Sequence, residues 1–172
     1  MEVRRVILPL AAAALFFAVA PASADTKADI QKLYNKLATA FKNGDMKLLM
    51  TTAAPGFKMK EHGQTMNAEQ ARAQLEGMFK SGFKINQCTM KVESFKLKGN
   101  TATVKALGHT DGLMPGPGGK KMHMVSDTVS RDILVKTPQG WKFKFAETVS
   151  DNTTMDGKKF DPSTMAPPAP KQ

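Results

Sequence analysis

Four long runs of alternating apolar and polar residues fill most of the second half of the chain and constrain its fold more than any other feature. The runs cover residues 85–97, 101–110, 122–136 and 141–150, with turn or loop sequences between them. Alternation with a period of two is typical of strands that have one buried and one exposed face. Because consecutive strands joined by short connections pair antiparallel, these runs predict an antiparallel sheet.

The first half of the chain has helical periodicity instead. Apolar residues spaced three and four apart predict a helix over residues 25–41, and shorter helical patterns follow Asp45 and Asn67. A brief strand pair, residues 57–61 and 64–66, lies between the last two helices. This order predicts an α+β fold in which a strongly curved antiparallel sheet wraps around three N-terminal helices.

The N-terminus has the features of a secretory signal peptide. Arg4 and Arg5 precede an apolar run from Val6 to Val19, and Ala22-Ser23-Ala24 has the small-x-small pattern of a cleavage site. The apolar run is too short to favour a transmembrane helix, and no second run is long enough to form one. We therefore expect residues 1–24 to be removed after Ala24, giving a periplasmic or secreted protein.

The remainder of the 172-residue chain is long enough for one domain. We expect that domain to cover residues 25–155, and the proline-rich residues 156–172 to form a disordered tail. The single cysteine, Cys88, cannot form a disulfide within the chain. The stability of the fold must therefore come from packing.

The chain carries an excess of positive charge. Its 25 Lys and Arg against 15 Asp and Glu give a formal net charge of +10. The lysines are scattered rather than gathered in blocks, which indicates a solvated surface more than a binding patch. For an exported protein, positive charge favours anionic lipid head groups, cell-surface polymers or acidic small molecules over nucleic acid as partners. We predict a small amphipathic or anionic ligand and no nucleic acid.

The last strand pair, residues 121–151, is the candidate wall of a binding pocket. One phase of the alternation contains Val125, Asp127, Val129, Arg131, Ile133, Val135, Trp141, Phe143, Phe145, Glu147 and Val149. Because most of these residues are apolar, we expect this phase to face inward. An inward Arg131 would need a partner, which Asp127 or Glu147 can supply. The group then forms either an ion pair at the rim or a site that binds a carboxylate or phosphate.

The order of the elements and three short motifs resemble the nuclear-transport-factor-2-like superfamily, which includes SnoaL-like and ketosteroid-isomerase-like proteins. The motifs are the helix junction at residues 40–45, the turn at 62–63 before 67–71, and residues 139–143 in the final hairpin. The resemblance covers nearly all of residues 25–151. It implies a cone-shaped α+β barrel whose mouth often binds a small apolar or amphipathic molecule.

The same resemblance suggests a different register for the pocket wall. Ketosteroid-isomerase-like enzymes use a carboxylate base together with a Tyr and a protonated acid as oxyanion donors. Lys60 stands where the base is expected, and Tyr34 lies about one helical turn earlier than the family's Tyr. Asp132 fits the position of the acid and would then point inward. A β-bulge near residues 133–134 would reconcile the two registers, but the apolar pattern favours an inward Arg131.

Together these patterns predict a pocket that binds a small molecule without catalysis. An isomerase or dehydratase using the same pocket is one alternative. A protein-interaction module that dimerises through the other strand face, at the even-numbered positions 122 to 130, is another. No catalytic residue, metal or cofactor is predicted. The candidate ligand-binding residues are Tyr34, Asp127, Arg131, Asp132, Trp141 and Glu147.

Overall fold

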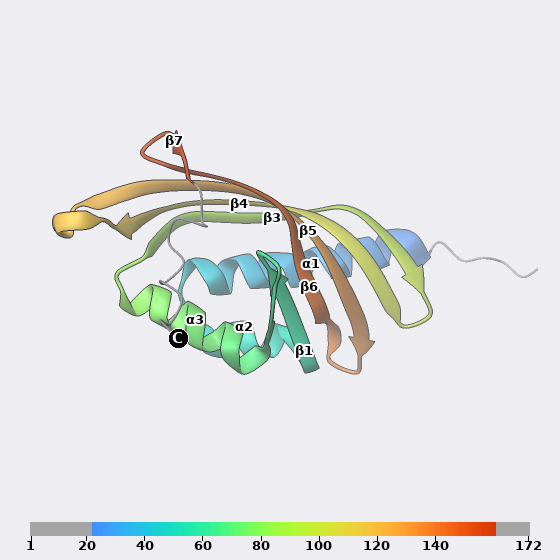
Figure 1. The fold of residues 1–172 in the computed structure, drawn as a ribbon. Helices are drawn as coiled ribbons and strands as arrows, with labels where there is room; N and C mark the ends of the chain where they lie inside the picture. The colour runs from blue at the N-terminus through green and yellow to red at the C-terminus, as the bar shows by residue number, and fades with distance from the viewer. Residues whose placement is uncertain (1–21, 161–172) are drawn as a thin grey trace, which may run out of the picture.

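Three helices form one side of the molecule in a computed structural model that describes residues 22–160 (Figure 1). They are α1 (Ala22–Lys42), α2 (Met46–Thr52) and α3 (Ala68–Lys80). All three predicted helices are present, and α1 begins three residues before the expected start of the mature chain. The proposed signal sequence up to residue 21, and the proline-rich residues 161–172, lie outside the described residues. Within residues 22–160, no helix is long and apolar enough to cross a membrane.

The remaining elements are strands. They are β1 (Ala53–Glu61), β2 (Gln64–Asn67), β3 (Lys84–Lys98), β4 (Thr101–Pro115), β5 (Lys121–Thr137), β6 (Gly140–Met155) and β7 (Lys158–Lys159), with a 3₁₀ turn at Pro117–Gly119. They form one seven-stranded sheet in the order β2-β1-β6-β5-β4-β3, with β7 paired to β6. The four predicted long strands are confirmed.

The sheet is mixed, which corrects the prediction of a purely antiparallel sheet. β1 pairs with β6 in the parallel direction, while the other strand pairs are antiparallel. Parallel pairing needs a long crossover connection, and the chain between β1 and β6 supplies one through α3 and β3–β5. The alternation within β1 does not contain this information, because it is the same for both directions.

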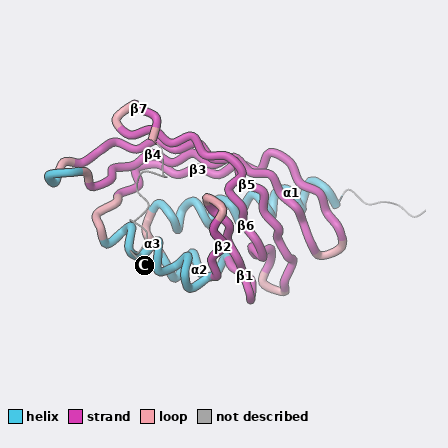
Figure 2. The backbone as a smooth tube through the Cα atoms, in the orientation of Figure 1, coloured by secondary structure: helices cyan, strands magenta, loops and turns pink. Residues whose placement is uncertain are grey.

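The sheet is strongly curved and unclosed, and it bends around α1, as the ribbon and the tube show (Figures 1 and 2). The predicted α+β cone fold is confirmed. Two of the helices begin where the sequence provides caps. The Asp45 carboxylate accepts a hydrogen bond from the Leu48 backbone N–H at 2.8 Å, and Asn67 and Gln70 form a reciprocal capping box.

The hydrophobic core lies between α1 and the concave face of the sheet. Its buried members are Ile30, Leu33, Tyr34, Val92, Ala102, Val104, Ala106, Leu134, Trp141 and Phe143. Leu134 and Val104 are fully buried and lie on the central strands β5 and β4. The sheet also continues beyond the expected domain end at residue 155, because β7 adds a short edge to β6.

Two β-bulges in β6 decide which side chains face the core. Phe145 pairs with Ile133 while Phe143 pairs with Leu134, so Lys144 is an extra residue between the two phenylalanines. A second extra residue, Val149, follows Thr148 in the same way. Each bulge exchanges the inward and outward faces of β6 from that point on.

The bulges correct the predicted inward phase of the last strand pair. On β5, Asp132 and Leu134 are buried, whereas the Arg131 side chain is 61% exposed on the opposite face. On β6, Phe143 is buried in the core and Val149 is 55% exposed. On β6, the predicted inward phase is therefore correct up to the first bulge and wrong directly after it. On β5, the predicted inward phase is wrong, because its row of β-branched residues covers the outer face.

Candidate functional site

A cavity of about 240 Å³ lies between the concave face of the sheet and the three helices. The helices contribute Tyr34, Leu37, Met46, Leu49, Met50, Thr52, Ala68, Ala71, Arg72 and Leu75. The strands contribute Ala53, Phe57, Met59, Met90, Ala106, Leu107, Gly108, Thr128, Ser130, Asp132, Phe143, Ala146 and Thr148. Most of these side chains are apolar, and several are the flexible, polarisable methionines that adapt to different ligand shapes. A concave, mostly apolar cavity with a few polar groups is typical of small-molecule sites.

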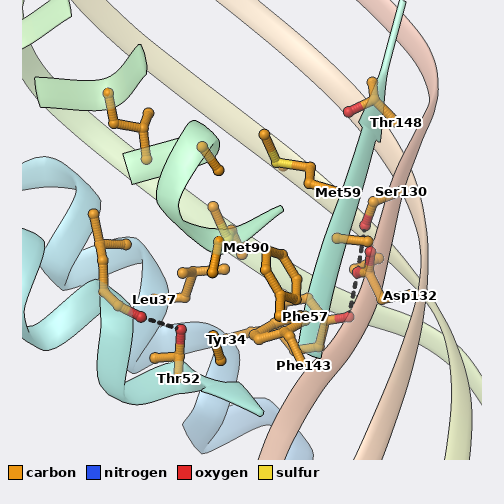
Figure 3. A pocket seen from close by; sticks show the side chains of 18 of the residues that line it. Tyr34, Leu37, Thr52, Phe57, Met59, Met90, Ser130, Asp132, Phe143 and Thr148 are labelled. Carbon is orange, nitrogen blue, oxygen red and sulfur yellow. Dashed lines mark hydrogen bonds between the residues drawn. The ribbon is translucent and has the colours of Figure 1, made fainter. Parts of the chain in front are cut away.

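The main polar feature of the cavity is a cluster of Tyr34, Ser130 and Asp132, called the Asp132 cluster below (Figure 3). The Tyr34 hydroxyl donates a hydrogen bond to Asp132 Oδ2 at 2.5 Å, and the Ser130 hydroxyl donates to the same oxygen at 2.7 Å. Tyr34 comes from α1, while Ser130 and Asp132 come from one face of β5. The Tyr34 ring packs edge-on against Phe143, with 5.2 Å between the ring centroids.

Burial dominates the electrostatics of this cluster. Asp132 is only 2% exposed, and burial raises the pKa of its carboxyl group from 3.8 to about 6. The hydrogen bonds from Tyr34 and Ser130 oppose this rise, and the Glu147 backbone contributes a smaller opposing effect. The pKa of the Tyr34 hydroxyl is raised well above its ordinary range, first by burial and then by the neighbouring Asp132.

The Asp132 carboxyl group can therefore change protonation state under mildly acidic conditions. Its Oδ1 atom is buried and has no well-aligned hydrogen-bond partner among residues 22–160. An unpaired buried oxygen disfavours the ionised form, in agreement with the raised pKa of the carboxyl. The Tyr34 hydroxyl remains protonated over the physiological range, so it stays a hydrogen-bond donor.

Two of the six predicted site residues, Tyr34 and Asp132, line the cavity, and they are in direct contact. Trp141 is buried in the adjoining core but is not part of the cavity lining. Asp127 lies on the outer face of the sheet, where it pairs with His109 at 2.8 Å. The sequence did not predict the Tyr34–Asp132 contact, because the two residues are 98 positions apart on different elements.

Arg131 and Glu147 form an ion pair at 2.6 Å on the outer face of the sheet, which corrects their expected position in the pocket. Lys60 pairs with the other Glu147 oxygen at 3.0 Å. The hydrogen bond from Arg131, followed by that from Lys60, holds the pKa of the Glu147 carboxyl below its usual value. The cluster thus has the geometry of an ion pair that braces the sheet and not of an anion-binding pocket. On β1 the cavity is lined by Met59, next to Lys60 and in the opposite phase.

The sequence interpretation missed the hydroxyl groups of the cavity wall. Ser130 and Thr128 were assigned to an outer, dimerising face, but both line the cavity. These two residues lie on the even-numbered face of β5, which the sequence pattern predicted to be the outer face because most of its side chains are polar. Leu134 is on the same face and is fully buried, so it is the residue that could have identified this face as the inner one. Thr148 lines the cavity from β6, between the two bulges.

Metal chemistry has no geometric support in the part of the chain that the structure describes. No group of three or more His, Cys, Asp or Glu side chains is placed to hold a metal ion within residues 22–160. His123 pairs with Asp111 at 2.7 Å on the outer face, in the same manner as the His109–Asp127 pair. The cavity contains one carboxylate, and a lone carboxylate in an apolar setting is a poor metal site.

Comparison with known proteins places the fold. No family model and no curated protein matches the sequence. Solved structures do match: a conserved protein of Planctomyces limnophilus has a TM-score of 0.62 and 13% identity, covering 72% of this chain and 94% of that one. A scytalone dehydratase-like protein of Novosphingobium aromaticivorans has a TM-score of 0.60 and 14% identity, covering 74% and 89%. A ketosteroid isomerase-like protein of Erwinia carotovora atroseptica has a TM-score of 0.57 and 13% identity, covering 74% and 98%.

These similarities define the class of the fold. The chain has the same α+β cone fold as these ketosteroid isomerase-like and scytalone dehydratase-like structures, which is the fold that the resemblance of its element order and motifs implied. At such low sequence identity, the similarity shows the fold alone. Proteins with the same fold can have different functions, so the function depends on the residues that line the cavity.

Proposed function

We propose that this protein binds a small, mostly apolar molecule in the cavity between the sheet and the helices. The observation that carries the proposal is the cavity of about 240 Å³ with one polar cluster on its wall. Its volume lies just below the roughly 300–1,000 Å³ typical of sites for drug-sized ligands. A ligand the size of a bicyclic aromatic molecule is therefore suitable. The ligand gains affinity from buried apolar surface and orientation from hydrogen bonds at one end.

The Asp132 cluster sets the chemistry of the polar end of the ligand. The Tyr34 and Ser130 hydroxyls each donate their single proton to Asp132, so their oxygens can accept a hydrogen bond from a hydroxyl group of the ligand. Either hydroxyl can donate to a carbonyl oxygen of the ligand only by exchanging its bond to Asp132 for that one. An anionic group at this end would lie close to a carboxylate, so the cluster favours a neutral oxygen. The sequence suggested an amphipathic or anionic ligand. For this end of the cavity we propose instead a neutral carbonyl or hydroxyl group.

Coumarin, a flat bicyclic lactone, is a suitable probe. Titration calorimetry with the purified protein should give saturable binding with one site per chain. Ala71 is buried on α3 and lines the cavity, so Ala71→Phe should place a ring in the space and weaken binding by about tenfold or more. Leu97→Phe, which puts the same ring at a position that is 46% exposed, is the matched control and should bind as the wild type does.

Two outcomes of this titration would contradict the proposal. One is the absence of binding. The other is an equal affinity of both Phe variants and the wild type, which would place the coumarin on the outer surface. Thermal unfolding of each variant separates a filled cavity from a misfolded chain. Arg131→Ala should leave coumarin affinity unchanged, because the Arg131 side chain lies on the outer face of the sheet.

An isomerase or dehydratase is a second candidate, and the raised pKa of the Asp132 carboxyl favours it. A carboxyl group with a pKa of about 6 beside a tyrosine hydroxyl can exchange a proton with a bound carbonyl compound. The exchange of the α-protons of a cyclic ketone for deuterium in deuterated water, measured by NMR, tests this candidate. Exchange that the protein accelerates and that Asp132→Asn abolishes would support catalysis, and no acceleration above the protein-free rate would reject it.

A further inference from the structure

The cavity wall formed by β5 and β6 carries hydroxyl groups beyond the Asp132 cluster. Ser130 and then Thr128 follow Asp132 along the same face of β5, and Thr148 is the cross-strand partner of Ser130. All of them line the cavity. Same-face neighbours on a strand are about 7 Å apart, and directly paired side chains on adjacent strands are about 5 Å apart. The hydroxyl groups on this wall therefore extend beyond the Asp132 cluster to Thr128 and Thr148.

The two threonine hydroxyls in this row are available to a ligand. Ser130 donates its proton to Asp132, but no hydrogen bond joins the Thr128 or the Thr148 hydroxyl to another side chain or backbone group within residues 22–160. The fully enclosed side-chain atoms without a partner are Asp132 Oδ1 and Trp141 Nε1, so neither threonine hydroxyl is sealed off. Each can bind water in the empty cavity or an oxygen atom of a ligand.

The space around Thr128 depends on a glycine. A Cβ atom at Gly108, on the neighbouring strand β4, would lie 2.5 Å from Thr128 Oγ1. The absence of a side chain at Gly108 thus leaves room for the hydroxyl at the cavity wall. Gly108 itself lines the cavity and has an ordinary backbone conformation, so the close approach and not a turn accounts for it.

The wall of the cavity formed by the helices is mostly apolar. Figure 3 shows Thr148, Ser130 and Asp132 along the strands on one side, while Leu37 of α1 lies across the cavity from them. A ligand that fills this space meets hydrogen-bonding groups along one edge and hydrocarbon along the other. If that edge of the ligand lacked a second oxygen, binding would leave the threonine hydroxyls without water and without a partner.

We propose that the ligand is a flat molecule with two oxygen substituents on the same edge, one bound by the Asp132 cluster and the other by Thr128 and Thr148. This inference rests on the proposed function and adds the class of ligand. The spacing of the two contact points is set by Ser130, the member of the cluster on β5 that is nearest to Thr128. Side chains two positions apart on one face of a strand are separated by about 7 Å. A bicyclic ring system can carry oxygens at that separation.

Three coumarins test the arrangement in the full-length folded protein. In 7-hydroxycoumarin the hydroxyl and the carbonyl lie on the same long edge, in 6-hydroxycoumarin they lie on opposite edges, and coumarin has no hydroxyl. Calorimetry at a pH that keeps the phenol neutral should show the 7-hydroxy isomer binding about tenfold more tightly than the 6-hydroxy isomer. The double variant Thr128→Val, Thr148→Val keeps the side-chain shapes and should reduce that preference to about twofold or less.

Controls separate this inference from the proposed function. Thr103→Val, at an exposed position of β4, should bind coumarin as the wild type does and keep the full preference for the 7-hydroxy isomer. In the double variant, the affinity of each hydroxy isomer is compared with that of coumarin in the same protein, so a general change in the cavity does not count as a loss of preference. If coumarin binds but the two hydroxy isomers bind equally, or if the double variant keeps the preference, the inference is overturned while the proposed function stands. If none of the three compounds binds, both are overturned.

Discussion

Asp132→Asn is expected to raise the free energy of unfolding above that of the wild type by more at neutral pH than at acidic pH. Burial raises the pKa of the Asp132 carboxyl from 3.8 to about 6, so the folded state binds more protons than the unfolded state between these values. The free energy of unfolding that depends on this group is therefore highest below pH 3.8 and falls as the pH rises through about 6. With about 1.4 kcal/mol for each pKa unit, the loss amounts to roughly 3 kcal/mol.

Asp132→Asn removes this loss, because the amide stays neutral and its oxygen can still accept hydrogen bonds from Tyr34 and Ser130. Urea unfolding of both proteins across this pH range measures the effect. The difference in unfolding free energy between the D132N variant and the wild type should move in favour of the variant by roughly 3 kcal/mol as the pH rises from about 3 to about 8. A difference that is constant with pH would mean that the Asp132 carboxyl is not buried as the structure describes.

Phe143→Ala is expected to be far more destabilising than Phe145→Ala. Phe143 is 4% exposed, belongs to the core and packs edge-on against Tyr34. Its truncation should cost about 3–5 kcal/mol, as is usual for a buried phenylalanine. Phe145 lies on the outer face, beyond the bulge at Lys144, and its truncation should cost about 1 kcal/mol.

The two phenylalanines are a matched pair, since they have the same side chain and are two positions apart on one strand. In a regular strand they would share a face, and their truncations would have similar costs. Unfolding in urea at one pH gives both values. Equal losses would contradict the bulge at Lys144, and with it the inward position of Ala146 and Thr148 in the cavity wall.

Most of the architecture could be predicted from the sequence, because it depends on local patterns. The helix after Asn67 has a capping box that can be read directly from its residues, and the alternation of apolar residues marks each long strand. The parallel pairing of β1 with β6 could not be read in this way, since strand direction depends on where the chain returns to the sheet.

The site was harder to predict, because it depends on a bulge and on the outer surface of the sheet. Val129, Ile133 and Val135 formed an apolar row that favoured an inward Arg131, yet this row covers the outer face of β5. β-branched side chains suit a strand on either face, so their presence alone does not identify the buried side. The isomerase-like register, which the resemblance suggested, had Asp132 on the correct face. The Tyr34–Asp132 contact required the packing of α1 against the sheet, which no local pattern encodes.

The most direct test of the buried Asp132 cluster and of its role in binding is the titration of the Asp132 carboxyl carbon by NMR, with and without coumarin. Because the carboxyl is buried, we expect a pKa of about 6 in the free protein. We expect this pKa to rise further when coumarin is bound, because a ligand that displaces water from the cavity adds to the desolvation of the carboxyl. A carboxyl that titrates near 3.8 and does not respond to coumarin would contradict both the geometry of the cluster and its role in binding.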